Sequence, residues 1–190
     1  MSSELDKLRK EVALLRKLVY KDPLTGLYNR RGFLDEGEKI FSAVRQANHH
    51  LTRRKNYFIK DLALIFVDLD DFKKVNDEFG HKVGDIILKK TANLLIGAVR
   101  LNDLVCRWGG EEMLVLLVGA SDSNARRIAE ELRQRIEGTK FQNGPKTIRI
   151  TASFGVAPMK RETALEELVQ RADKAMYKAK KSGKNKVVII

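Results

Sequence analysis

A run of six apolar residues, Leu62–Val67, constrains the fold of this chain more than any other feature. The run ends at Asp68, and Leu69 and Asp70 follow it. A strand with one solvated face alternates apolar and polar residues, whereas an uninterrupted apolar run predicts a strand buried on both faces. We therefore expect a layered protein in which this strand is central.

The rest of the chain shows both helical and extended patterns. Gly109-Gly110 lies between two strand-like segments, Leu104–Trp108 and Met113–Val118, which is a hairpin signal. Such a hairpin predicts an α/β (α+β) sandwich with a mixed, mostly antiparallel central sheet flanked by helices. We expect a glycine turn through Gly80 and Gly84. The other expected elements are helices at 30 to about 54, 86–99, 125–136 and 165–181, and strands at 148–156 and 186–190.

The N-terminal residues 1–21 form a separate unit, an expected helix. Pro23 disfavours helix at the residue before it, so we place the second domain at residues 22–190. A helix this short is marginal by itself, so we expect a two-chain coiled coil; the alternative is an amphipathic helix that lies on its own domain. The apolar residues three and four positions apart, as at heptad positions a and d, are Leu5, Leu8, Val12, Leu15 and Val19.

The charge balance indicates a polyanionic partner, because 37 Lys and Arg residues stand against 25 Asp and Glu residues, a formal charge of +12. Nucleic acid is disfavoured because interleaved aromatic residues are missing. No apolar run reaches the roughly 18 residues of a membrane span, and the N-terminus lacks the apolar region of a signal peptide. Cys106 is the one cysteine, which excludes an intrachain disulfide. We expect a cytoplasmic protein that binds neither nucleic acid nor membrane.

Carboxylates follow both the apolar strand and the hairpin glycines. Asp68 ends the strand, and Glu111 and Glu112 follow Gly110. If the two strands are neighbours, these side chains meet at one edge of the sheet and form a site for a hard cation such as Mg²⁺, which prefers carboxylate and phosphate oxygens. The alternative is a set of solvated acids in surface turns.

Five motifs follow one another along the chain: DPLTGLYNRRGF at Asp22–Phe33, DLDDFKKVNDEFGHKVGD at Asp68–Asp85, RWGGEEM at Arg107–Met113, ASFGVA at Ala152–Ala157 and RADKAMYKAKKSGKN at Arg171–Asn185. In order and spacing they resemble the GGDEF domain of bacterial diguanylate cyclases. The resemblance implies a nucleotide-cyclase-like fold and the condensation of two GTP into cyclic di-GMP and two pyrophosphates. It also implies a homodimer, because each domain holds one GTP, and an N-terminal helix that usually links the domain to a sensor.

The resemblance implies a metal site with Mg²⁺ (or Mn²⁺), two ions per active half-site. Asp68, Glu111 and Glu112 match the catalytic acids and metal ligands, and the carbonyl of Leu69 also faces the metal. Met113 replaces the usual phenylalanine, and we expect little effect because both are apolar.

The resemblance also implies the GTP contacts. Asn76 and Asp85 match the pair that binds the guanine edge. Lys184 stands where arginine is usual, so we expect weaker binding of the GTP phosphates. The phosphate contacts are Lys73, Lys180 and Lys184, and Gly109 and Gly110 allow the hairpin to approach the nucleotide closely.

Arg100 and Asp103 match the RxxD site at which cyclic di-GMP inhibits members of this family. A second arginine often completes that site, but Glu131 occupies the aligned position, and Arg127 and Arg133 are nearby candidates. The alternative function is a catalytically weak domain that acts as a GTP or cyclic di-GMP receptor. The basic stretch His49–Tyr57 has no function that we can infer.

Overall fold

The computed structural model describes residues 2–49 and 61–190. Its centre is a six-stranded sheet with the strand order β1-β3-β4-β2-β7-β8. Three of its five pairings are antiparallel, and the two outer pairings are parallel. The strands are β1 (Tyr28–Asn29), β2 (Leu62–Leu69), β3 (Leu104–Gly109), β4 (Glu112–Val118), β7 (Ala152–Pro158) and β8 (Val187–Ile189).

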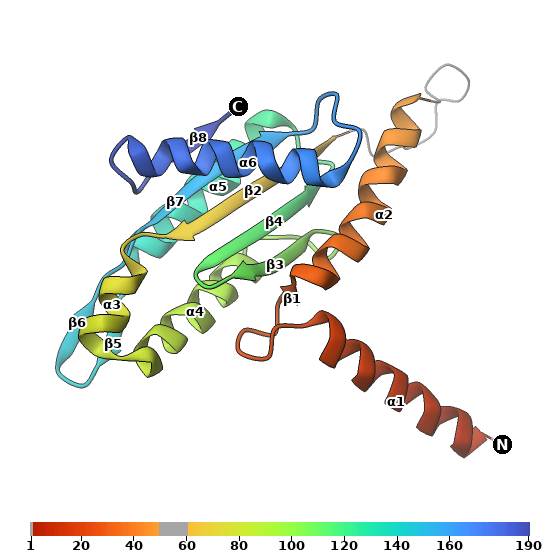
Figure 1. The fold of residues 1–190 in the computed structure, drawn as a ribbon, viewed down its shortest axis with the longest axis horizontal. Helices are drawn as coiled ribbons and strands as arrows, with labels where there is room; N and C mark the ends of the chain where they lie inside the picture. Colours follow the sequence, from red (N-terminus) through yellow and green to blue (C-terminus); the bar gives the residue numbers. More distant parts are fainter. Residues whose placement is uncertain (1, 50–60) are drawn as a thin grey trace.

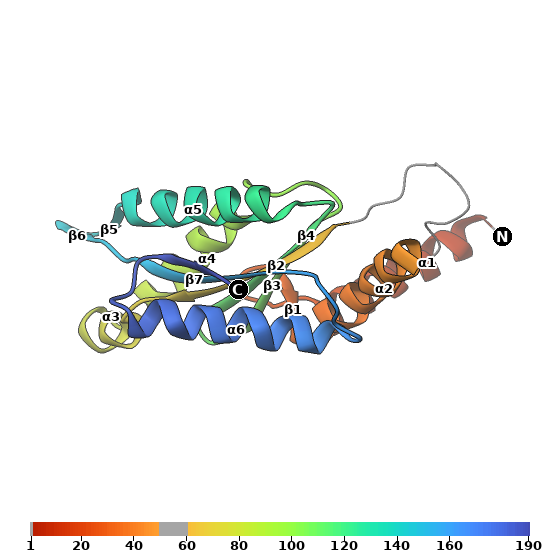
Figure 2. The same ribbon diagram turned by 90° about the horizontal axis from the view of Figure 1, so that it is seen from above.

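Helices cover both faces of this sheet (Figures 1 and 2). Figure 2 shows α4 (His81–Ile96) and α5 (Asp122–Gly138) on one face, and α2 (Arg30–His49) and α6 (Leu165–Lys181) on the other. The short helix α3 (Phe72–Phe79) connects the end of β2 to α4. The expected fold, a mixed and mostly antiparallel sheet flanked by helices, is confirmed.

Strand β2 is central and buried on both faces, as its apolar run predicts. It pairs with β4 on one side and with β7 on the other. Ala63, Ile65 and Val67 pack in the core beneath α4 and α5, whereas Leu64 and Phe66 pack in the core beneath α2 and α6. This alternation fixes the register, because a slip of one residue would exchange the two sets. It also directs the next even-numbered residue, Asp68, toward the α6 face.

Two expected elements are wrong in detail. Gly84 lies inside α4, not in a turn; the turn is at Gly80, which has a φ of 82°. The expected strand 148–156 is two strands, because β6 (Lys146–Ile148) pairs with β5 (Phe141–Asn143) in a separate hairpin before β7 begins. The predicted helix from residue 30 is present as α2 up to His49, and the rest of its predicted length lies outside the described residues, as does nearly all of the basic stretch His49–Tyr57.

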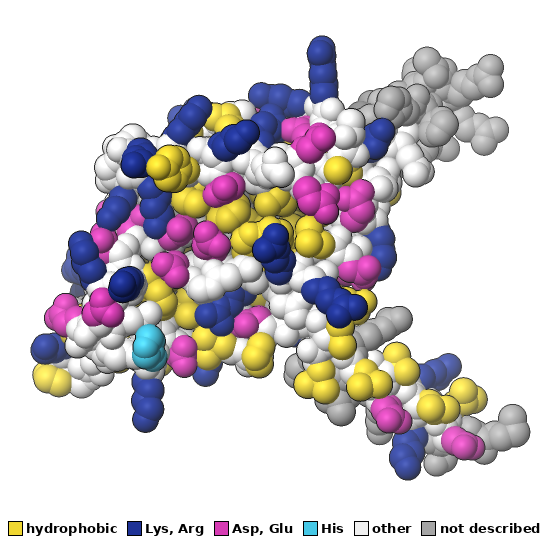
Figure 3. Space-filling model, in the orientation of Figure 1, with side chains coloured by type: hydrophobic (Ala, Val, Ile, Leu, Met, Phe, Trp, Pro, Cys, Tyr) yellow, Lys and Arg dark blue, Asp and Glu magenta, His cyan; other side chains and the backbone are white. Residues whose placement is uncertain are grey.

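Helix α1 (Ser2–Tyr20) projects away from the sheet and its covering helices (Figure 1). Figure 3 shows hydrophobic side chains along this projecting helix. None of the helices in the described ranges has the length and apolar character needed to cross a membrane. The exposed apolar side chains of α1, with 40–69% of their surface accessible, are Leu5, Leu8, Val12, Leu15, Leu18 and Val19.

Candidate active site

The pairing of β2 with β4 brings the predicted acidic residues together. Asp68 lies directly opposite Glu112 in the antiparallel register, and Glu111 lies in the adjoining β3–β4 turn. Gly110 occupies that turn with a φ of 52°, a left-handed conformation that glycine adopts readily. Residues more than forty positions apart in the sequence therefore form one acidic cluster where β2 ends and β4 begins.

The C-terminal end of α6 places a cation against this cluster. The Nζ atom of Lys180 lies 2.5 Å from Oδ1 of Asp68 and 3.4 Å from the carbonyl oxygen of Leu69. The Lys180 side chain is 24% exposed, so the contact lies in a partly desolvated site. Lys184, just past α6, lies 2.7 Å from Asp71. Two of the predicted phosphate-binding lysines thus surround the end of β2.

Burial and neighbouring acids raise the pKa of two acids of the cluster, Asp68 and Glu112. Burial is the largest cause of the raised pKa of Asp68, and Glu111 adds to it, although the hydrogen bond from Lys180 opposes the shift. Burial, followed by repulsion from Asp68, raises the pKa of Glu112. By contrast, hydrogen bonds from Lys184 and Lys74 lower the pKa of the exposed Asp71 to about 2. Ionised carboxylates in such a cluster are unfavourable without a cation, so the cluster favours binding of positive charge.

The oxygen atoms at this site fit a metal ion that takes its remaining ligands from the substrate and from water. Within residues 2–49 and 61–190, no three His, Cys, Asp or Glu side chains form a group able to hold a metal ion by themselves. However, the ammonium group of Lys180 shows that Asp68 Oδ1 and the Leu69 carbonyl converge on one cationic group. Mg²⁺ is typically held by one or two carboxylates together with substrate phosphates and water, so this arrangement fits the predicted metal.

The predicted guanine-binding residues lie at the junction of α3 and α4. Asn76 is on α3, and its amide packs against Gly84, the residue before Asp85 on α4. The Oδ1 atom of Asn76 is buried and has no hydrogen-bond partner in the described part of the chain. The amide oxygen therefore points into the protein, so the amide nitrogen of Asn76 and the exposed carboxylate of Asp85 are the groups that this junction can offer to a polar ligand.

Asp70 supports the site, although its role does not follow from the sequence. Its buried carboxylate accepts hydrogen bonds from Thr151 Oγ1 (2.8 Å), Ser153 Oγ (2.7 Å) and the backbone N–H of Asn185 (3.0 Å). These bonds connect β2, β7 and the turn after α6. Lys184 and Asn185 both have left-handed φ values in that turn, 60° and 45°, so the turn needs such support. The Asp-Leu-Asp sequence could have marked Asp70 as a candidate site residue. The hydrogen-bond partners of its carboxylate, however, lie more than eighty positions away in the sequence.

A family model for the diguanylate cyclase GGDEF domain matches residues 19–186 of this chain. The chain belongs to the GGDEF family. The response regulator PleD of Caulobacter vibrioides is 37% identical over 189 residues, 96% of this chain and 38% of PleD. The diguanylate cyclase DosC of Escherichia coli is 38% identical over 187 residues, 93% of this chain and 38% of DosC. The chain therefore spans less than two fifths of the length of these curated relatives.

Solved structures of GGDEF proteins have the same fold. The coiled coil and GGDEF domain of DgcB from Caulobacter crescentus, in complex with c-di-GMP, matches with a TM-score of 0.85 at 26% identity, over 100% of this chain and 95% of that one. The diguanylate cyclase SiaD of Pseudomonas aeruginosa, in complex with its activator SiaC, matches with a TM-score of 0.80 at 32% identity, over 100% of this chain and 69% of SiaD. GGDEF diguanylate cyclases are generally metal-dependent.

One arginine of this GGDEF domain connects the signature turn to the end of the N-terminal helix. Arg107 Nε donates to the carbonyl of Gly110 at 2.9 Å, and its Nη1 lies 3.2 Å from Asp22 Oδ2. Asp22 also accepts from the hydroxyl of Thr25 at 2.6 Å. The loop that follows α1 is therefore held directly against the turn that carries Glu111.

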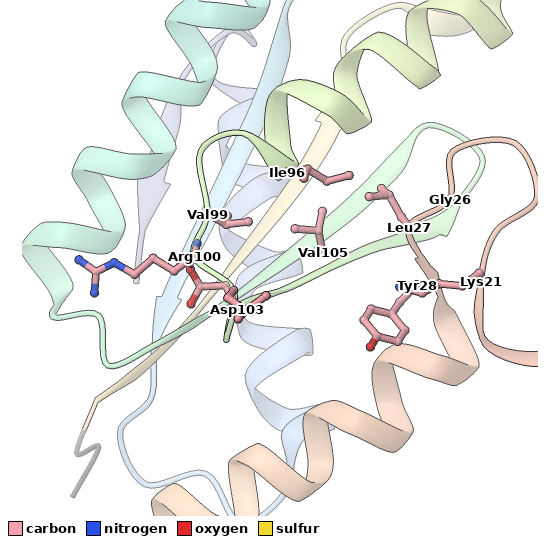
Figure 4. A pocket seen from close by; sticks show the side chains of 10 residues that line it. Lys21, Gly26, Leu27, Tyr28, Ile96, Val99, Arg100, Asp103 and Val105 are labelled. Atoms are coloured by element: carbon pink, nitrogen blue, oxygen red, sulfur yellow. Dashed lines mark hydrogen bonds between the residues drawn. The ribbon is translucent and has the colours of Figure 1, made fainter. Parts of the chain in front are cut away.

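The predicted inhibitory residues of the GGDEF domain lie in the turn between α4 and β3. The two oxygens of Asp103 accept from the backbone N–H groups of Arg100 and Val118, both at 2.8 Å. The Arg100 side chain is exposed, and in Figure 4 it extends away from Leu27 and Val105, which line a pocket of about 270 Å³. Asp103 thus shapes the turn, and Arg100 presents an exposed side chain beside it.

The two candidate second arginines differ in their surroundings. Arg133 is mostly buried and donates to Glu130, Glu137 and Asn185, so its guanidinium group is used in hydrogen bonds within the domain. Arg127 is well exposed and forms an ion pair with Glu131 at 3.4 Å. Of the two candidates, Arg127 therefore has the more accessible side chain.

Proposed function

We propose that this chain is a diguanylate cyclase that condenses two GTP molecules into cyclic di-GMP and releases two pyrophosphates. The observation that carries the proposal is the register of β2 against β4, which places Asp68 opposite Glu112 and beside Lys180. Both acidic positions of the signature are occupied, by Glu111 and Glu112. Relatives of similar sequence are named diguanylate cyclases, which supports the same conclusion.

In the proposed reaction, the 3′-hydroxyl of one GTP attacks the α-phosphorus of the other and pyrophosphate leaves; the reciprocal attack then closes the ring and releases the second pyrophosphate. Asp68, the Leu69 carbonyl, Glu111 and Glu112 would hold Mg²⁺, which supplies charge neutralisation at the phosphates. Lys180 and Lys184, with Lys73 on α3, would bind the phosphates and offset the negative charge of the leaving pyrophosphate. Glu111 and Glu112 are the candidate proton acceptors for the attacking hydroxyl.

We assign the recognition of the guanine base to Asn76 and Asp85. A carboxylate at Asp85 can accept from the N1–H and the amino group of guanine, and adenine would leave it without those donors. An unpaired polar group in a closed site costs about 1–3 kcal/mol, which favours GTP over ATP.

Incubation of the purified chain with GTP and Mg²⁺, followed by chromatography of the products, tests the proposal. We expect cyclic di-GMP and pyrophosphate in a ratio of one to two. Binding of GTP or cyclic di-GMP without any turnover would instead favour the receptor function. The cytoplasmic setting stays a prediction.

Catalysis needs two domains that face each other, and we propose that α1 pairs two chains. Leu8 lies on the exposed apolar stripe of α1, and Lys7 is its exposed neighbour on the polar side. A parallel coiled coil would raise the local concentration of the second domain to about the millimolar range. Leu8→Asp should therefore lower the specific activity about tenfold at low micromolar protein, with recovery as the protein concentration rises.

The matched control for the helix is Lys7→Asp, which introduces the same side chain one position away from the stripe. It should keep the dependence of rate on protein concentration that the unchanged protein shows. Equal curves for Leu8→Asp and Lys7→Asp would count against a coiled-coil dimer. Sedimentation velocity reports the oligomeric state of each variant directly.

We propose that cyclic di-GMP inhibits the enzyme through Arg100. Because this side chain is exposed and can donate two hydrogen bonds to one ligand, Arg100→Ala should raise the half-inhibitory concentration of cyclic di-GMP by about tenfold or more. Initial rates at increasing product concentration measure the effect. Asp103→Ala is a poorer test, because Asp103 also holds two backbone N–H groups of the turn. The charge-matched control is Arg149→Ala, because Arg149 is an exposed arginine next to the β5–β6 hairpin. Equal inhibition of the unchanged chain, Arg100→Ala and Arg149→Ala would refute the site.

A further inference from the structure

Gly84 occupies a position in α4 that its backbone does not require. The residue is helical, and its φ is not among the positive values that favour glycine. Alanine is the better helix former, so helical propensity alone would favour a side chain here. The reason for glycine must therefore lie in what surrounds the missing side chain.

The space beside Gly84 is filled by the amide of Asn76. A Cβ atom added at Gly84 would lie 2.0 Å from Oδ1 of Asn76 and 3.1 Å from its Cγ. The next nearest atom is Cζ of Phe72, also at 3.1 Å. No real Cβ contact is as short as 2.0 Å, so the Asn76 amide and a side chain at position 84 cannot both occupy these places.

No protein hydrogen bond in the described part of the chain holds Oδ1 of Asn76, although that atom is buried. The shape of the gap over Gly84 therefore sets the position of the amide. With Oδ1 turned inward against Gly84, the amide nitrogen is the group left to face a ligand. Asp85, the other predicted guanine contact, is the following residue of α4.

We propose that Gly84 is a specificity-determining residue, which positions the Asn76 amide for guanine by leaving room for it against α4. The inference rests on the proposed function, in which Asn76 and Asp85 bind the base. An alanine at position 84 would push away the far end of a flexible side chain and not a backbone segment. The helix can therefore stay intact while the amide leaves its place.

The test uses 3′-deoxy-GTP and 3′-deoxy-ATP with Mg²⁺, because neither has the 3′-hydroxyl that reacts, so binding is measured without turnover. Titration calorimetry is applied to the unchanged chain, to Gly84→Ala, to Asn76→Ala and to the double variant. We expect Gly84→Ala and Asn76→Ala each to weaken 3′-deoxy-GTP binding about tenfold and to leave the weaker binding of 3′-deoxy-ATP within about twofold. In the Asn76→Ala background, Gly84→Ala should add less than about twofold, because it acts through Asn76.

The possible outcomes separate the inference from the proposed function. Unchanged 3′-deoxy-GTP binding by Asn76→Ala would overturn the guanine assignment, and the inference with it. Weak binding by Asn76→Ala with normal binding by Gly84→Ala would overturn the inference alone. Losses of 3′-deoxy-GTP affinity that multiply in the double variant would also overturn the inference alone, because they would show that Gly84 acts through Phe72 or the helix.

Thermal unfolding of the same proteins guards against a loss of fold. Gly97→Ala, at the C-terminal end of α4, is the matched control, with its nearest neighbour at 3.3 Å from the added Cβ. If Gly84→Ala alone lowers the unfolding temperature, the double variant should restore it, since removal of the Asn76 amide makes room for the new Cβ. Failure of the double variant to recover stability would contradict the inference.

Discussion

Asp68→Asn should abolish the synthesis of cyclic di-GMP, with a fall in turnover of about a thousandfold or more, while the chain stays folded. The two side chains have nearly the same shape, so the substitution leaves the β2–β4 pairing intact. It removes the negative charge that faces Lys180 at 2.5 Å and that would hold the metal with the Leu69 carbonyl. Rates of cyclic di-GMP formation at saturating GTP and Mg²⁺ measure the effect.

Asp77→Asn is the control for this loss of activity. Asp77 lies on α3, eight positions after the end of β2, is exposed, and undergoes the same change of charge. We expect its turnover to stay within about twofold of the unchanged chain. Retention of more than a tenth of the activity by Asp68→Asn would rule out the proposed metal site, and an equal loss in Asp77→Asn would show that net charge, and not the ligand, is responsible.

The sequence contains most of what is needed to predict the core of this fold. The apolar run before Asp68 predicts a central strand, and the two glycines before Glu111 predict the hairpin beside it. Both predictions depend on local periodicity and turn chemistry, which need no knowledge of distant residues. The pairing of β2 with β4, and with it the convergence of Asp68 and Glu112, follows once these two strands are neighbours.

The parts that the sequence leaves open depend on contacts between distant segments. The carboxylate of Asp70 holds a turn more than one hundred positions away through Asn185, and local patterns carry no information about such a partner. Gly84 suggests a turn from its residue type, but a neighbouring side chain explains the glycine. The motif around Lys180 predicts that this lysine binds phosphate. Its position beside Asp68, however, depends on the packing of α6 on β2 and β7.

Gly155→Ala should destabilise the domain by about 3 kcal/mol or more, through overpacking of a site that cannot relax. Gly155 lies in the middle of β7, where α6 packs directly on the sheet. A Cβ atom there would lie 2.0 Å from the carbonyl oxygen of Ala172 and 2.2 Å from the backbone nitrogen of Met176. Both are backbone atoms of one helix, so relief requires α6 as a whole to move away from β7.

Movement of α6 would also displace Lys180 from Asp68, so Gly155→Ala should lower the rate of any protein that stays folded. For a domain of this size, 3 kcal/mol corresponds to a fall in the unfolding temperature of roughly 6–12 °C. Gly138→Ala, at the end of α5, is the matched control: nothing lies within 4 Å of its added Cβ, and we expect a change of less than about 0.5 kcal/mol. Equal unfolding temperatures for the two variants would show that α6 does not pack on β7 through Gly155, and would remove the structural basis for placing Lys180 at the active site.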